Sequence, residues 1–184
     1  MKNAALFIVD VQNDFLPGGA LAVPRGNEVI EPVNRLMDRF DTVLASKDWH
    51  PARSLHFEKW PVHCVRGTRG ASFPDSLKVE KITKVFLKGT GYTDDGYSAF
   101  EATNEDLESY LRRFGIQKLV ITGLATDYCV KATAIDAARK GFTVYVVTDA
   151  VRAVNLRPDD EKKALEEMQR AGVKLIDEKQ TETI

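Results

Sequence analysis

Short apolar runs rich in Val, Ile and Leu recur along the chain and are separated by longer polar stretches. Runs of this length, bounded by polar and turn residues, are typical of strands that are buried on both faces of a sheet. They predict strands at 5–9, 42–45, 84–87, 118–122, 143–147 and 173–176.

Between most of these runs, apolar residues recur at helical spacing. Stripes of this kind predict helices within 29–40, over 107–114, and between Pro158 and Gly172. Strands that alternate with helices favour parallel pairing with right-handed crossovers. We therefore expect an α/β protein with three layers, α/β/α, around a central, mostly parallel six-stranded sheet of the Rossmann-like type.

The segment 46–82 interrupts the alternation. It is rich in His, Trp, Pro, Gly and Arg and too irregular for a regular element. Loops of this length in a compact domain are usually functional or disordered. Because the segment holds both tryptophans and all three histidines of the chain, we expect an ordered loop with a function.

Composition narrows the classes of protein. With 184 residues, 43% of them hydrophobic, the chain can bury one sizeable core, and we expect a single domain over 1–184. Lys and Arg total 26 against 27 for Asp and Glu, a balance that argues against nucleic-acid and membrane partners and favours a small-molecule substrate. The oligomeric state stays open, a homo-oligomer included.

The N-terminal segment shows no leader pattern, and no apolar run is long enough to span a membrane, so a soluble cytoplasmic protein is expected. In that reducing compartment, Cys64 and Cys129 are expected to be free thiols rather than a disulfide.

Polar and nucleophilic residues stand where the predicted strands end. Asp10 ends the first strand, Asp48 and His50 follow the second, Lys88 ends the third and Cys129 follows the fourth. In open α/β sheets the ligand crevice lies at the carboxyl ends of the strands. The topology therefore predicts that these side chains meet at one edge of the sheet.

Cys129 is a candidate nucleophile. If Thr126 is the N-cap of the following helix, Cys129 lies in its first turn, where free N–H groups and the helix dipole favour a thiolate. Lys88 could supply a further positive charge and Asp10 the base that takes the thiol proton. The alternatives are that Cys129 is a small buried residue and that Asp10 is a structural, salt-bridged carboxylate.

Asp48, His50, His56 and His63 form a second cluster of candidates. Imidazole and carboxylate ligands suit Zn, Fe or Mn, and a site of this kind with an open position would be catalytic or ligand-binding. The alternative is that the histidines only make loop hydrogen bonds. Cys64 could be a fifth ligand, but we expect its side chain to point into the core.

The glycine-rich segment 89–96, GTGYTDDG, matches neither common phosphate-binding motif, which makes nucleotide binding a weak interpretation. It is predicted to be a mobile surface loop with a role as a lid. A GxSxG motif is absent, which argues against a serine hydrolase of the α/β-hydrolase type.

Five separate motifs resemble one family in order along nearly the whole chain: IVDVQNDF, SKDWHP, WPVHCV with GTRGASF, FLKGT with GYSAFEAT, and GLATDYCV. They resemble the nicotinamidase and pyrazinamidase branch of the isochorismatase-like cysteine hydrolases. The resemblance implies hydrolysis of nicotinamide to nicotinic acid and ammonia, with a place in NAD salvage. It also implies activity on pyrazinamide.

The resemblance also implies roles for individual residues. Asp10, Lys88 and Cys129 match the catalytic triad, and Asp48, His50 and His63 match ligands of one divalent metal ion. Many members have a further histidine where this chain has Ser54; here it comes two residues later, as His56. The aromatic substrate pocket is matched by Phe15, Trp60 and Tyr97, and a cis peptide is implied between Leu124 and Ala125, whose N–H would face the oxyanion.

Two rival functions remain. One is an amide hydrolase of the same superfamily that acts on a carbamoyl or ureido substrate and needs no four-ligand metal loop. The other is a catalytically silent protein that binds metal or nicotinamide. The complete set of Asp10, Lys88 and Cys129 argues against the second.

Overall fold

The structure, a computed structural model, describes residues 3–184. Its sheet has the strand order β3-β2-β1-β4-β5-β6, and every neighbouring pair is parallel. The strands are β1 (Ala4–Val9), β2 (Val43–Asp48), β3 (Lys84–Lys88), β4 (Lys118–Leu124), β5 (Thr143–Arg152) and β6 (Lys174–Ile176). The expected six-stranded α/β fold is confirmed, and the sheet is parallel throughout.

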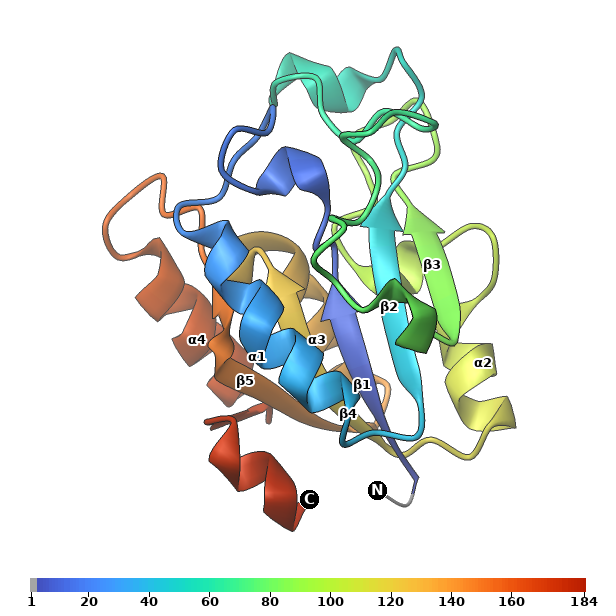
Figure 1. Cartoon of the computed structure of the whole chain (residues 1–184), viewed down its shortest axis with the longest axis vertical. Coiled ribbons are helices and arrows are strands. Elements are labelled where there is room, and N and C mark those ends of the chain that lie inside the picture. Colours follow the sequence, from blue (N-terminus) through green and yellow to red (C-terminus); the bar gives the residue numbers. More distant parts are fainter. Residues whose placement is uncertain (1–2) are drawn as a thin grey trace.

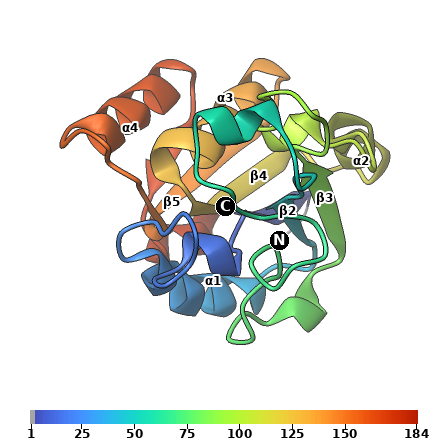
Figure 2. The same cartoon turned by 90° about the horizontal axis from the view of Figure 1, so that it is seen from above.

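Four helices cover the two faces of the sheet (Figures 1 and 2). They are α1 (Ile30–Met37), α2 (Leu107–Arg113), α3 (Lys131–Arg139) and α4 (Asp160–Arg170). Viewed from above, α1 lies on one side of the sheet and α2, α3 and α4 lie on the other (Figure 2). Short helical turns connect the larger elements: Asn13–Phe15, Gly26–Val29, Leu55–Glu58, Val79–Lys81, Ala99–Glu101, Thr126–Val130 and Lys179–Thr183.

The central strand β1 is buried on both faces, which is why it appears in the sequence as a continuous apolar run. Leu6 and Ile8 pack in the core beneath α1, whereas Phe7 and Val9 pack in the core beneath α2 and α3. None of the helices among residues 3–184 is long and apolar enough to cross a membrane.

The strand order reverses between β1 and β4, because the chain builds outward through β2 and β3 before it returns to pair β4 with β1. This is the point at which ligands bind in open α/β sheets. Gly123, near the end of β4, allows β4 to approach β1 closely. Its φ is +108°, and a Cβ at this position would collide with the carbonyl oxygen of Val9 in β1.

Three strands extend two or more residues beyond their predicted carboxyl ends. The second, fourth and fifth continue at their carboxyl ends to Asp48, Leu124 and Arg152. Asp48 therefore lies in β2 rather than after it, and the irregular segment begins only at Trp49. The sequence did not show these extensions because polar residues and glycine interrupt the apolar runs, although the backbone continues the sheet.

Candidate active site

A buried lysine joins the side chains at the carboxyl ends of the central strands. The Lys88 ammonium lies 2.8 Å from Oδ2 of Asp10, directly after β1, and 3.4 Å from Sγ of Cys129, in the turn after β4. It also donates to the carbonyl oxygen of Gly96 at 2.7 Å and pairs with Oδ1 of Asp48. The structure thus brings the candidate base, cation and nucleophile into one cluster at the predicted edge.

The opposite charges in this cluster stabilise the ionised forms of Lys88 and Asp48. Burial alone would lower the pKa of Lys88, but the carboxylates of Asp10 and Asp48 raise it well above its ordinary value. Burial also acts on Asp48, yet the Lys88 ammonium and the neighbouring histidines hold the pKa of that carboxyl well below its usual range. At neutral pH the cluster therefore contains a charged ammonium and an ionised Asp48.

Asp10 has the properties of a base for neutral pH. Its side chain is fully buried, and Ser46 donates a hydrogen bond to Oδ1 at 2.7 Å. Burial raises the pKa of Asp10 from 3.8 to about 6, since the opposing effect of Lys88 is partly offset by the charge of Asp48. A base with a pKa just below the working pH is ionised yet still basic enough to accept a proton.

The expectation of a ready thiolate at Cys129 is wrong in two respects. Ala125, not Thr126, is the N-cap, and Cys129 lies in a single π-helical turn, Thr126–Val130, ahead of α3. Burial raises the pKa of the Cys129 thiol well above its ordinary value; the Lys88 ammonium opposes this effect, but Asp10 and Asp48 add to it. The resting side chain is therefore a thiol that needs a base. A carboxylate oxygen of Asp10 lies within 4.8 Å of Sγ of Cys129, close enough for Asp10 to be that base.

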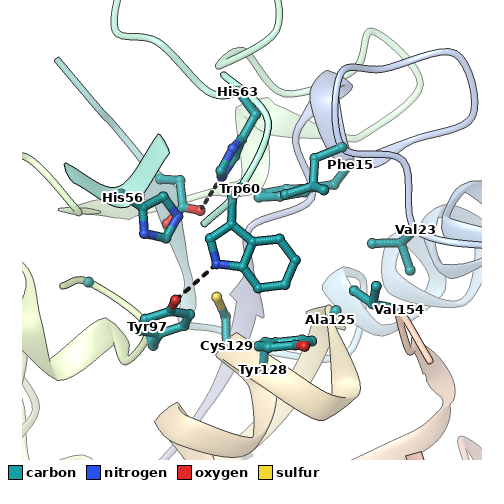
Figure 3. A pocket seen from close by; sticks show the side chains of 13 residues that line it. Phe15, Val23, His56, Trp60, His63, Tyr97, Ala125, Tyr128, Cys129 and Val154 are labelled. Carbon is teal, nitrogen blue, oxygen red and sulfur yellow. Dashed lines mark hydrogen bonds and ion pairs between the residues drawn. The ribbon is translucent and has the colours of Figure 1, made fainter. Parts of the chain in front are cut away.

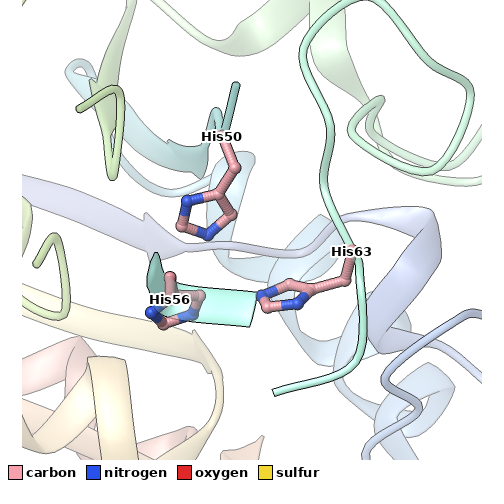
Figure 4. A group of neighbouring side chains, drawn as sticks. All are labelled: His50, His56 and His63. Carbon is pink, nitrogen blue, oxygen red and sulfur yellow. The ribbon is translucent and has the colours of Figure 1, made fainter. Parts of the chain in front are cut away.

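The three histidines face one another across a small space (Figure 4). Each ring has its Nδ1 beside an acceptor. Nδ1 of His50 lies 2.8 Å from the Gly89 carbonyl oxygen, and Nδ1 of His63 lies 2.7 Å from the Pro61 carbonyl oxygen. Nδ1 of His56 lies 2.7 Å from the Asp94 carboxylate. Because these acceptors require Nδ1 to donate, the lone pair of each ring is on Nε2.

These lone pairs fit a metal ion. Potential ligand atoms of the three histidines all lie within 4.8 Å of one another, and Nε2 of His50 is buried with no hydrogen-bond partner among residues 3–184. Oδ2 of Asp48 lies 3.7 Å from Nε2 of both His50 and His63. An orphaned imidazole nitrogen beside an ionised carboxylate is the donor set expected for a divalent cation.

Asp48 connects the two halves of the site, because Oδ1 pairs with Lys88 while Oδ2 faces the histidines. Its backbone is held by Gln12, whose side-chain amide donates to the Asp48 carbonyl and accepts from the Asp48 N–H, both at 2.8 Å. Sequence reasoning missed Gln12. A polar amide inside the apolar start of the chain was the available signal, since a buried amide must find partners.

A pocket lies between His56, His63 and Cys129 (Figure 3). Phe15, Trp60, Tyr97 and Ala125 line it, as the resemblance implies, and Trp60 Nε1 donates to the Tyr97 hydroxyl at 3.0 Å. The other lining residues are Leu21, Val23, Asp48, His56, His63, Gly96, Tyr128, Cys129 and Val154.

Leu124 is not among the residues that line the cavity, and its side chain packs in the hydrophobic core on the α1 side. The peptide bond from Leu124 to Ala125 is cis, as the resemblance implies. Leu21, Val23 and Val154 were missed because they come from segments without a motif, and only the folded chain brings them to the cavity.

Cys64 lies away from this chemistry. Its side chain is fully buried in the core on the α1 side, and its backbone N–H donates to Asp14 Oδ2 at 2.7 Å. Burial and the surrounding carboxylates raise the pKa of its thiol well above the ordinary value. The core position predicted for Cys64 is confirmed, and both cysteines are free thiols.

Comparison with known proteins agrees with this geometry. The isochorismatase domain matches residues 4–180. Nicotinamidase of Escherichia coli is 41% identical over 202 residues, which cover 95% of this chain and 95% of that protein.

Solved structures resemble the whole fold. A nicotinamidase pyrazinamidase of Acinetobacter baumanii has a TM-score of 0.92 at 34% identity, covering 98% of this chain and 99% of that one. The pyrazinamidase of Pyrococcus horikoshii in complex with zinc has a TM-score of 0.84 at 41% identity, covering 95% of this chain and 99% of that one.

The chain belongs to the isochorismatase family. Within that family it groups with nicotinamidases and pyrazinamidases, and it is an enzyme of the amide-hydrolase class.

Proposed function

We propose that the protein is a nicotinamidase, which hydrolyses nicotinamide to nicotinic acid and ammonia through a thioester on Cys129. The observation that supports this most is the position of Lys88, which holds Asp10 beside Cys129 at one wall of a cavity whose opposite wall carries the histidines. The names of the E. coli and A. baumanii relatives support the choice of substrate.

In the first half of the reaction Asp10 takes the thiol proton from Cys129, and the sulfur attacks the carboxamide carbon. The backbone N–H groups of Ala125 and Cys129 are proposed to stabilise the oxyanion. When the C–N bond breaks, Asp10 returns the proton to the nitrogen, so that ammonia leaves and a thioester remains on Cys129.

In the second half Asp10 takes a proton from water, and the resulting hydroxide attacks the thioester carbon. The C–S bond breaks, nicotinic acid leaves, and the proton returns to the sulfur. Lys88 stays charged throughout and keeps Asp10 and Cys129 in position, since its pKa is raised by the same carboxylates that it binds.

We propose that Asp48, His50, His56 and His63 hold one divalent ion, Zn, Fe or Mn. When bound, the ion would act as a Lewis acid that accepts the lone pair of the pyridine nitrogen, which would orient the ring. Phe15, Trp60 and Tyr97 hold the ring by packing against it. Pyrazinamide has the same shape and the same ring nitrogen, so it is the expected second substrate. Release of nicotinic acid would place the enzyme in NAD salvage.

The test is ammonia release from nicotinamide by the purified, metal-loaded protein, measured beside Cys129→Ala and a chelator-treated sample. Release that disappears in both controls is the expected result. No release by the metal-loaded wild type would reject nicotinamide as substrate and favour the carbamoyl-type hydrolases, which a panel of carbamoyl and ureido compounds would then identify.

A further inference from the structure

Asp94 lies at the centre of a group of contacts that the proposed reaction does not use. It belongs to the segment 89–96, between β3 and the short turn Ala99–Glu101. Its Oδ1 accepts from Nδ1 of His56 at 2.7 Å and from the Tyr97 hydroxyl at 3.2 Å, and its Oδ2 pairs with the Lys59 ammonium. Its side chain is only 19% exposed.

His56 differs from the other two histidines in what holds it. His50 and His63 donate to backbone carbonyls, which every variant of the chain retains. His56 is in a single helical turn, Leu55–Glu58, and its Nδ1 donates to a side chain from another loop. A carboxylate can only accept, so Asp94 directs the His56 lone pair at Nε2 toward the other rings.

Asp94 also belongs to a set of bonds between the two loops. The Leu55 N–H donates to the Tyr92 carbonyl at 2.9 Å, and the Ser54 hydroxyl donates to the Thr93 carbonyl at 3.3 Å. These bonds fix the backbone of 54–55 against 92–93, directly beside His56 and Asp94. The carboxylate therefore meets the imidazole in a framework that does not depend on either side chain.

The same carboxylate reaches the wall of the substrate cavity. The Tyr97 hydroxyl donates to Asp94 and accepts from Trp60 Nε1, and both aromatic rings line the cavity beside His56 (Figure 3). The Asp94 carboxylate thus contacts both His56, a candidate metal ligand, and Tyr97, which lines the cavity proposed to hold the substrate ring. Loss of Asp94 would remove both hydrogen bonds.

We propose that Asp94 is a positioning residue for the metal site: it holds His56 with Nε2 directed to the ion and links that ligand to Tyr97 in the pocket wall. This inference rests on the proposed function in one respect, which is that His56 is taken as the fourth ligand. It assigns to the segment 89–96 a defined task in place of the mobile lid expected from its sequence.

The experiment measures Zn²⁺ affinity of the full chain, stripped of metal and titrated in competition with a chromophoric chelator. Asp94→Ala is expected to weaken binding about 10- to 100-fold, the usual effect of removing a carboxylate behind a histidine ligand. Asp94→Asn retains an acceptor oxygen without the charge and is expected to lie between Asp94→Ala and the wild type.

Asp95→Asn is the matched control, because it removes the same charge from the same loop. Asp95 is exposed, and no hydrogen bond or ion pair of its carboxylate occurs within residues 3–184. Its zinc affinity is expected to equal that of the wild type. An equal loss in Asp95→Asn and Asp94→Asn would mean that only the overall charge matters, and it would overturn the proposal.

A double variant tests whether Asp94 acts through His56. If it does, His56→Ala combined with Asp94→Ala binds zinc no more weakly than His56→Ala alone, whereas losses that multiply overturn the inference. Wild-type zinc affinity in Asp94→Ala would also overturn it while leaving the proposed function intact. A wild-type protein that binds no zinc would overturn both the metal site and this inference, and intact zinc binding without nicotinamide hydrolysis would remove only the substrate.

Substrate kinetics supply a second readout. At saturating zinc the kcat of Asp94→Ala is expected to return to near the wild-type value, while KM stays raised because the Tyr97 hydroxyl has lost its acceptor. A kcat that stays low at saturating zinc would show that Asp94 acts on the catalytic cluster instead and would overturn the positioning role.

Discussion

The two halves of the site are built in different ways. Asp10 directly follows the central strand β1, which pairs with a strand on each side, and Lys88 ends the edge strand β3, which pairs with β2. His56 and His63 lie on the irregular segment after β2, where the Asp94 carboxylate from another loop holds the His56 ring and the nearby Pro61 carbonyl holds the His63 ring. Chemistry that must be placed within a fraction of an ångström thus lies on the rigid scaffold, while ligand and substrate groups lie on loops.

The largest effect is expected where the scaffold carries the nucleophile. Cys129→Ala should lower kcat by at least ~10⁴-fold, because no other side chain can form the thioester. Binding of nicotinamide, measured by calorimetry, should remain near the wild-type value.

Cys64→Ala is the matched control for that variant, since it removes the other thiol from the core. It should lower the melting temperature and leave kcat unchanged. Near wild-type turnover by Cys129→Ala would show that catalysis is not covalent at this residue.

The next effect concerns the base. Asp10→Asn should lower kcat/KM by about 10²- to 10⁴-fold, because an amide cannot take the thiol proton. In the wild type the pKa of Asp10 is raised from 3.8 to about 6, so protonation below that pH removes the base and activity should fall about tenfold per pH unit. A pH profile that stays flat to pH 5 would contradict this assignment.

Variants on the loop side should affect the metal before they affect chemistry. His50→Ala should lose bound metal, because its buried Nε2 faces the other ligands and has no other partner within residues 3–184. His56→Ala should lose less, since its position depends on contacts between two loops. Elemental analysis after dialysis measures both, and wild-type metal content in His50→Ala would refute the ligand set.

The smallest effect is expected from Ser46→Ala, which tests the strand-borne half of the site. Ser46→Ala removes the hydrogen bond to Asp10 Oδ1, which favours the ionised form. The pKa of Asp10 should therefore rise, and the acid limb of the activity profile should move to higher pH. A few-fold loss of activity near pH 6 with no loss near pH 8 is expected in steady-state assays, and an unchanged acid limb would show that Ser46 has no part in setting this pKa.

The sequence predicted the strand-borne half of the site better than the loop-borne half. Asp10 and Lys88 could be placed because apolar runs show where strands end, and parallel strands end at one edge. His56 could be named as a candidate ligand because it belongs to the cluster of histidines, but what orients its ring could not be predicted, and Asp94 could not be named at all. No local rule links a histidine to a carboxylate 38 residues away on another loop.

The protonation of Cys129 likewise could not be predicted from the sequence. Its place ahead of a helix predicted a stabilised thiolate, but burial and the two carboxylates raise the thiol pKa. The helix start is visible in the sequence, whereas the net field is a sum over groups from four strands that only the fold brings together.

By itself the sequence determined the alternation of strands and helices, the parallel sheet and the chemical groups at its edge, because hydrophobic periodicity and strand order act locally or through topology. Only the tertiary structure decided the tautomers of His50 and His56, the position of Leu124 in the core, and the shifts in the pKa of Asp10 and of Cys129. Those properties depend on burial and on distances of a few ångströms between segments far apart in the chain, and such distances exist only once the core has packed.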